Sequence, residues 1–151
     1  MIIEGSHTLS HPCRRVWDFI SDPNQIVQCL PETARFEIKN AKSFTVISKV
    51  KIAFLSGTFK LDFNYLEQVP PSRLTFEAVG EGLGVFIRLN TVIDLKTREV
   101  STTELKWKTD AEVGGILAEL PPTLIQAGTD NYTRRFFECV KSKLDTTRID
   151  N

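Results

Sequence analysis

The side chains that could take part in chemistry are scattered, and their spacing matches no catalytic or metal-binding set. The two histidines, His7 and His11, are too few and too far from acidic partners in the predicted pattern to indicate a metal site. The three cysteines, Cys13, Cys29 and Cys139, are odd in number and lack a Cys-x-x-Cys pair, so we expect free thiols with structural roles. We therefore assign no catalytic residue, no metal and no cofactor.

Two glycine-rich segments raise the question of an anion site. Residues 80–84 read Gly-Glu-Gly-Leu-Gly, but they lie between two predicted strands and lack the helix N-terminus that a phosphate site needs. We interpret this segment as a hairpin tip at the mouth of a cavity. Gly114 and Gly115 do precede a predicted helix, although a tight chain reversal explains them more simply.

Alternation of apolar and polar residues is the dominant pattern from residue 34 to residue 113. The clearest case is residues 59–65, Phe-Lys-Leu-Asp-Phe-Asn-Tyr, whose period of two predicts a strand with one dry face. The same signal predicts strands at 2–10, 34–39, 43–54, 57–68, 73–80, 85–96 and 101–112. Short connections rich in turn residues separate the last six, which indicates an antiparallel meander.

Helical signals occur before and after this meander. A short helix is predicted to end near Ile20, with Ser10 as its capping residue and Pro12 in its first turn. A second short helix is predicted over 24–30. Apolar or small residues recur every three or four positions from Leu117 to Leu144, with an interruption at Pro121-Pro122. We expect a helical turn, a break, and a helix over 122–144.

These elements predict an α+β fold. A seven-stranded curved antiparallel sheet wraps round a long C-terminal helix, with two short helices between the first and second strands. A single sheet curled round one helix encloses more volume than one helix face can fill, so a ligand cavity is favoured over a fully packed core. The predicted lining consists of Ile26, Leu30, Val46, Val50, Phe59, Leu61, Phe63, Tyr65, Leu74, Phe76, Ile87, Leu89, Thr91, Trp107, Leu117, Leu120 and Leu124.

Few polar groups share the inward face. They are Ser48, Tyr65, Thr91, Thr109 and His7, and none forms a carboxylate pair or a nucleophile-base set. The Tyr65 hydroxyl could bind the polar end of a ligand. The alternative, a tyrosine packed in the core with a water or backbone partner, is left open.

Composition excludes several classes of partner. The chain has 151 residues with 19 basic and 19 acidic side chains interspersed, so it has no basic surface for nucleic acid and no polybasic run. Apolar runs are only a few residues long, and the N-terminus begins with a strand-like segment, so we expect a cytoplasmic protein without a membrane anchor. We predict one domain over residues 1–146 and a polar tail over 147–151.

Several short motifs carry a family resemblance. Residues 15–19 (Arg-Val-Trp-Asp-Phe), 22–23 (Asp-Pro) and 29–31 (Cys-Leu-Pro) resemble the opening of the START-like helix-grip (SRPBCC) superfamily. Residues 111–118 (Ala-Glu-Val-Gly-Gly-Ile-Leu-Ala) and 135–137 (Arg-Phe-Phe) resemble a second signature of one branch, the CoxG family of carbon monoxide dehydrogenase proteins. Together with the strand order, the resemblance covers essentially the whole chain.

The resemblance implies a function. Superfamily members bind lipids, sterols, polyketides or other apolar molecules, and a minority are cyclases. The CoxG family is associated with molybdenum hydroxylases of the carbon monoxide dehydrogenase type, with proposed roles in membrane recruitment and quinone handling. We therefore expect a non-catalytic carrier of a lipid or isoprenoid quinone, accessory to such an oxidoreductase and with at most transient membrane contact.

Two alternatives stay open. A polyketide-cyclase-like enzyme would need acids such as Glu32, Asp62 or Glu104 inside the cavity. An assembly or membrane-recruitment factor would act through its outer surface instead.

The chain departs from the family pattern in three places. Glu32 stands where the family usually has glycine after Leu-Pro, which alters a turn near the expected cavity mouth. Pro121-Pro122 interrupts the start of the long helix, and the chain ends with polar residues where some relatives carry a membrane-contacting extension.

Overall fold

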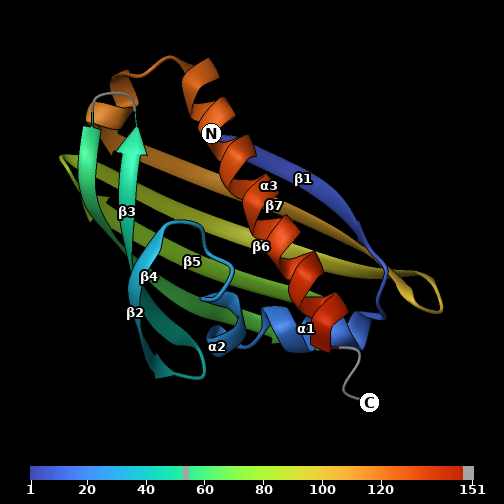
Figure 1. Ribbon diagram of the computed structural model, residues 1–151. Helices are drawn as coiled ribbons and strands as arrows, with labels where there is room; N and C mark the ends of the chain where they lie inside the picture. Colours follow the sequence, from blue (N-terminus) through green and yellow to red (C-terminus); the bar gives the residue numbers. More distant parts are fainter. Residues whose placement is uncertain (53–54, 148–151) are drawn as a thin grey trace.

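One antiparallel sheet of seven strands forms the body of the molecule. The computed structural model describes residues 1–52 and 55–147, and the strand order across the sheet is β1-β7-β6-β5-β4-β3-β2 (Figure 1). The strands are β1 (Ile2–Leu9), β2 (Thr33–Asn40), β3 (Ser43–Ile52), β4 (Leu55–Val69), β5 (Arg73–Gly82), β6 (Val85–Glu99) and β7 (Thr102–Gly115). The predicted seven-stranded meander is confirmed. Residues 53–54 of one predicted strand, and residues 148–151 of the predicted tail, lie outside the described residues.

The helices also follow the predicted order. They are α1 (Cys13–Ile20), α2 (Pro23–Ile26), the short 3-10 helix η1 (Ile116–Glu119) and α3 (Pro122–Thr147). Helix α3 lies across one face of the sheet and ends beside α1 (Figure 1). The break predicted at Pro121-Pro122 separates η1 from α3, because proline is favoured in the first turn of a helix but not in its interior. No described helix is long and apolar enough to cross a membrane.

Two details at the short helices differ from the prediction. Helix α1 begins after Pro12, which is its N-cap residue, so Ser10 does not cap it. Helix α2 ends at Ile26 and is shorter than the predicted 24–30. The carboxylate of Asp22 accepts the backbone N–H of Asn24 at 3.0 Å and caps α2 instead.

The apolar interior divides into two parts. The main core gathers α1, α2, the adjoining ends of the strands and the C-terminal half of α3, and its fully buried members include Phe44, Leu74, Leu105 and Val140. The second cluster is small and lies at the η1 end of the sheet, where Phe59, Val85 and Leu117 are buried together.

The prediction of three free thiols is wrong for two of the cysteines. Cys29 and Cys139 form a disulfide with Cα atoms 5.4 Å apart, although 110 residues separate them in sequence. Cysteine spacing could not reveal this pair, because the packing of α3 against the segment after α2 brings the residues together. Cys13 is free, as predicted.

Candidate ligand-binding site

The N-terminal half of α3 is not packed tightly on the sheet. Every residue from Pro122 to Tyr132 is at least partly exposed, whereas Phe137, Val140 and Leu144 further along are buried. A methyl group added at Gly128 would meet no atom within 4 Å. Only the second half of α3 therefore holds the helix on the main core.

The sheet beneath this half of α3 carries apolar side chains that are incompletely covered. Leu61, Ile87 and Leu89 share the inward face with buried residues such as Ala78, yet each is only half-buried. Side chains on the concave face of a sheet keep this exposure only when no other side chains fill the space above them. We call the partly exposed apolar surface of these three residues, together with the exposed residues 122–132 of α3, the central hollow.

The predicted lining residues fall into distinct groups. Fully buried in the main core are Ile26, Val46, Phe63, Tyr65 and Leu74. Buried in the second cluster are Phe59 and Leu117. Half-buried are Leu30, Val50, Leu61, Phe76, Ile87, Leu89, Trp107 and Leu120. Thr91 is buried beside Thr109, and Leu124 is 54% exposed on α3.

The Tyr65 hydroxyl already has a protein partner. It donates a hydrogen bond of 2.7 Å to the backbone carbonyl of Ile20, and the side chain is 6% exposed. Burial, with a smaller contribution from the Asp22 charge, raises the pKa of Tyr65, so the phenol stays protonated. Of the two readings of this residue, the packed core tyrosine with a backbone partner is the one that the structure supports.

Two other groups of hydroxyls on the inward face can form hydrogen bonds beyond those that the structure shows. The Ser48 hydroxyl is buried and makes no hydrogen bond to any described residue. Thr91 and Thr109 are opposite each other on β6 and β7 with their Oγ1 atoms 2.7 Å apart. Only one of their two protons can lie between the oxygens, so the pair can donate one further hydrogen bond.

An aromatic group occupies the β1 side of the inward face. The His7 ring stacks on Phe137 with centroids 3.8 Å apart, and its Nε2 accepts a long hydrogen bond of 3.4 Å from the Trp107 indole. Burial, followed by the nearby charge of Lys141, lowers the pKa of His7, so its ring is neutral at pH 7. Gly5 makes room for the indole, because a Cβ there would lie 2.8 Å from Nε1.

Tyr132 is a polar residue of this region that the sequence interpretation did not single out. It is 37% exposed, yet burial raises the pKa of its phenol, with an opposing contribution from Arg135. The Tyr132 phenol therefore stays protonated at pH 7, and its hydroxyl can donate a hydrogen bond. In the sequence, its position one helical turn from both Gly128 and Phe136 was the feature that placed it on the same face of the predicted helix.

The acids that an enzyme would need in the cavity lie elsewhere. Asp62 accepts a hydrogen bond from Thr45 on the outer face of the sheet, and Glu104 pairs with Arg98 at 2.9 Å. Glu32 pairs with Arg135 at 2.6 Å and is half exposed. None of these three carboxylates faces the central hollow. Within residues 1–52 and 55–147, no three His, Cys, Asp or Glu side chains gather to hold a metal ion.

Two shallow depressions lie outside the space between sheet and helix. One, of about 560 Å³, follows β2 and includes Gln28 and Phe36, and the other, of about 430 Å³, lies on the outer face of β3 and β4 around Lys49 and Lys60. Both are open to solvent and lined by a mixture of charged, polar and apolar residues. They match the chemistry of an apolar ligand less well than the central hollow does.

Several solved structures share this architecture. A conserved protein from Geobacillus kaustophilus superposes with a TM-score of 0.91 at 22% identity, covering 97% of each chain. A START superfamily protein from Mycobacterium smegmatis has a TM-score of 0.76 at 10% identity, covering 97% of this chain and 98% of that one. The Zhui aromatase/cyclase from a Streptomyces species has a TM-score of 0.71 at 15% identity, covering 96% and 93%. At these identities the likeness shows the fold alone, which is the START-like helix-grip fold.

The sequence matches one family model. The model described as the CoxG subunit of carbon monoxide dehydrogenase matches residues 5–145. No curated protein matches the sequence.

Proposed function

Because the chain belongs to the CoxG family, named for a component of carbon monoxide dehydrogenase, we propose that it binds an apolar small molecule between sheet and α3 and carries it without chemical change. The ligand class that fits is a lipid or an isoprenoid quinone. The observation that carries the proposal is the incompletely covered apolar surface of Leu61, Ile87 and Leu89 beneath the exposed half of α3. Burying a ligand on this surface yields about 25 cal/mol for each Å² of apolar area removed from water.

The polar groups around the hollow suit a ligand with one weakly polar end. Ser48, the Thr91–Thr109 pair and Tyr132 offer hydroxyl groups, and none of these residues carries a charge at pH 7. Such groups can bind a carbonyl or hydroxyl oxygen, but they do not compensate a charged head group. A quinone or a neutral lipid therefore fits better than an anionic lipid.

The family name supports a second part of the proposal, a partner. A carrier must release its ligand where the ligand is used, and we propose that this partner is an oxidoreductase of the carbon monoxide dehydrogenase type in the cytoplasm. A pull-down with tagged protein from its native host tests this part separately. Recovery of no oxidoreductase component contradicts the partnership and leaves the ligand proposal to its own test.

The alternative of a cyclase-like enzyme has less support. Its fold-level argument is the likeness to an aromatase/cyclase, but Glu32, Asp62 and Glu104 are engaged outside the hollow. The inward face then offers His7 as its only imidazole or carboxylate among the residues considered for proton transfer, and that ring already stacks on Phe137 and accepts a hydrogen bond from Trp107.

Ligand extraction tests the carrier function directly. We expect native mass spectrometry and organic extraction of the purified protein to reveal a lipid or quinone, and re-addition of that molecule to raise the melting temperature. Leu89→Trp places a larger ring in the hollow and should abolish both effects. Asn90→Trp, on the opposite face of the same strand, is the matched control and should retain them. A protein that stays empty and gains no thermal stability from either ligand class contradicts the proposal.

A further inference from the structure

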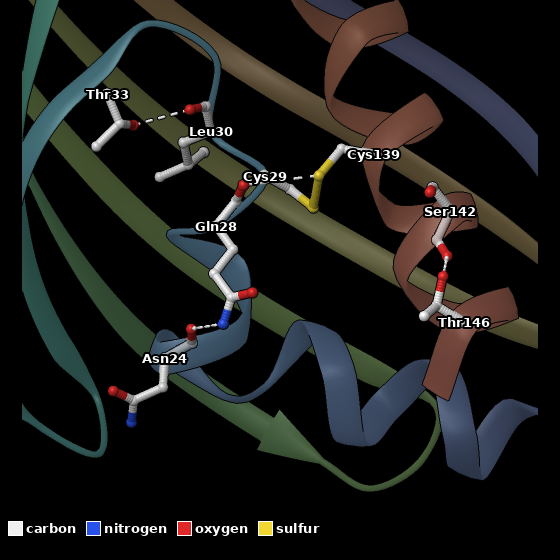
Figure 2. The surroundings of a disulfide bond; sticks show 8 residues. All are labelled: Asn24, Gln28, Cys29, Leu30, Thr33, Cys139, Ser142 and Thr146. Atoms are coloured by element: carbon white, nitrogen blue, oxygen red, sulfur yellow. Dashed lines mark hydrogen bonds between the residues drawn. A yellow bond between two sulfur atoms is a disulfide. The ribbon is translucent and has the colours of Figure 1, made fainter. Parts of the chain in front are cut away.

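The segment after α2 is joined to α3 by a covalent bond and by an ion pair. The disulfide between Cys29 and Cys139 is one, and Figure 2 shows it linking the chain just after α2 to the helix. The second is the ion pair between Glu32 and Arg135, whose carboxylate and guanidinium groups are 2.6 Å apart. Arg135 and Cys139 are four residues apart on α3, so both contacts use the same face of the helix.

This segment, residues 29–32, is itself attached to the β2–β3 side of the sheet. The Glu32 carbonyl accepts the backbone N–H of Lys49 at 2.9 Å, and Thr33 donates its hydroxyl to the Leu30 carbonyl at 2.8 Å (Figure 2). Leu30 lies between the two attachment points to α3 and packs against the main core. Residues 29–32 thus connect the sheet to the helix along one side of the molecule.

The disulfide joins α3 within its packed half, close to where that half begins. Phe137 before Cys139 and Val140 after it are buried in the main core, whereas residues 122–132 are exposed or half-buried. The ion pair beside it joins two half-exposed side chains, and such surface pairs contribute only about 0–1 kcal/mol. The covalent bond is therefore the stronger of the two restraints between residues 29–32 and the start of the packed half of α3, next to the exposed residues 122–132.

We propose that the Cys29–Cys139 disulfide is a redox-controlled restraint on access to the central hollow. In the oxidised protein, residues 29–32 and α3 are held together and ligand exchange is slow. Reduction separates them, so that the N-terminal half of α3 moves away from the sheet more often and ligand exchange is faster. The part of this inference that concerns ligand exchange rests on the proposed carrier function.

The chemical step is an ordinary thiol–disulfide exchange with a dithiol reductant. A thiolate of the reductant attacks the sulfur of Cys139, which is more exposed than the 3% exposed Cys29, and Cys29 leaves as a thiolate. The second thiol of the reductant then displaces Cys139. Two electrons and two protons pass to the protein, which ends with two thiols while the reductant becomes a disulfide.

Hydrogen–deuterium exchange on the ligand-free, full-length protein tests the restraint without any assumption about a ligand. Dithiothreitol should speed amide exchange by about tenfold or more in peptides covering residues 28–33 and 122–136, and much less in β6 and β7. Cys139→Ser should show the fast exchange without reductant and no further response to it. Cys13→Ser keeps the disulfide and should respond like the wild type.

A fluorescent apolar probe reports on access. Dissociation of Nile red, an uncharged apolar dye, should be about tenfold faster from the reduced than from the oxidised protein. Equal amide exchange in the two redox states, or three titratable thiols in protein purified without reductant, overturns the proposal. A redox-dependent change in amide exchange without binding of any apolar probe supports the restraint and contradicts the carrier function, so the two failures are distinguishable.

Discussion

Arg135 on α3 donates a hydrogen bond of 2.6 Å to the carboxylate of Glu32, a residue 103 positions earlier whose backbone φ is 62°. That φ lies in the left-handed region, which favours glycine, and glycine is what the family resemblance leads one to expect after Leu-Pro. Glu32 thus holds a turn that glycine would adopt more easily. Its carboxylate makes a charged contact between the segment after α2 and α3.

Replacing Glu32 separates its backbone effect from its charge effect. We expect Glu32→Gly to leave the free energy of unfolding within about 1 kcal/mol of wild type, because relief of the left-handed conformation offsets loss of a surface ion pair. Glu32→Ala loses the pair without that relief and should be about 1 kcal/mol less stable than Glu32→Gly. Urea unfolding under oxidising conditions measures both, with Arg135→Gln as the variant that removes only the pair. Equal stability of the glycine and alanine variants contradicts this account.

Tyr65 is predicted to contribute to stability and not to ligand binding. Tyr65→Phe removes the hydrogen bond to Ile20 and leaves a buried carbonyl unpaired, which should lower the free energy of unfolding by about 1–3 kcal/mol. The affinity for the extracted ligand should change less than about twofold, since the hydroxyl faces the backbone. A large loss of ligand affinity at unchanged stability would show that Tyr65 contacts the ligand.

The same tyrosine predicts a pH dependence at alkaline pH. Because the pKa of Tyr65 is raised in the folded protein, the unfolded chain loses this proton first as pH rises past the ordinary value of 10.0. The free energy of unfolding should then fall by about 1.4 kcal/mol per pH unit through this group, and this contribution is fully present below pH 10. Tyr65→Phe should remove that slope in denaturation curves between pH 9 and 11. Tyr132→Phe should change the slope less, because Tyr132 is 37% exposed.

Ser48 tests whether the hollow accepts a polar ligand end. Leaving a buried hydroxyl unpaired is unfavourable, so Ser48→Ala should stabilise the ligand-free protein by about 1 kcal/mol. If the ligand bonds this hydroxyl, the same change should weaken its binding by about tenfold. Ser43→Ala on the same strand is the control and should destabilise the protein, since Ser43 donates to Asn64 at 2.7 Å. A Ser48→Ala protein that is less stable than wild type contradicts the unpaired hydroxyl.

Gly5 and Gly128 should respond in opposite directions to substitution by alanine. The new methyl at Gly5 meets the Trp107 indole at 2.8–2.9 Å, so Gly5→Ala should destabilise the protein by about 1–3 kcal/mol. The methyl at Gly128 meets nothing within 4 Å and improves helix propensity, so Gly128→Ala should stabilise it by up to about 1 kcal/mol. Thermal unfolding of both variants measures the contrast. Destabilisation at Gly128 would indicate that α3 packs more closely on the sheet than described.

Much of the fold could be predicted because its signals are local. Alternation with a period of two marks each strand, and short turns between strands leave an antiparallel meander as the simplest connection. The proline pair at 121–122 ends one helical segment and begins another, because proline has no backbone N–H and its ring clashes with the preceding turn of a helix. The family motifs at residues 15–19 and 111–118 are likewise contiguous, and the family match bears them out.

The features that could not be predicted depend on residues far apart in sequence. Cys29 and Cys139 are 110 positions apart, and no spacing rule relates them until α3 is placed on the segment after α2. The partner of the Tyr65 hydroxyl is a carbonyl at the end of α1, 45 positions away. Both relationships arise from packing and not from propensity.

The strands, the long helix, the family and the apolar character of the inward face all follow from the order of the amino acids. Which inward residues are packed and which remain accessible is decided by the tertiary structure. Residues such as Phe63 and Leu89 have the same alternating pattern, but one is buried in the main core and the other is half-buried. The difference follows from the packing of α3, whose second half is buried in the main core and whose first half stays exposed.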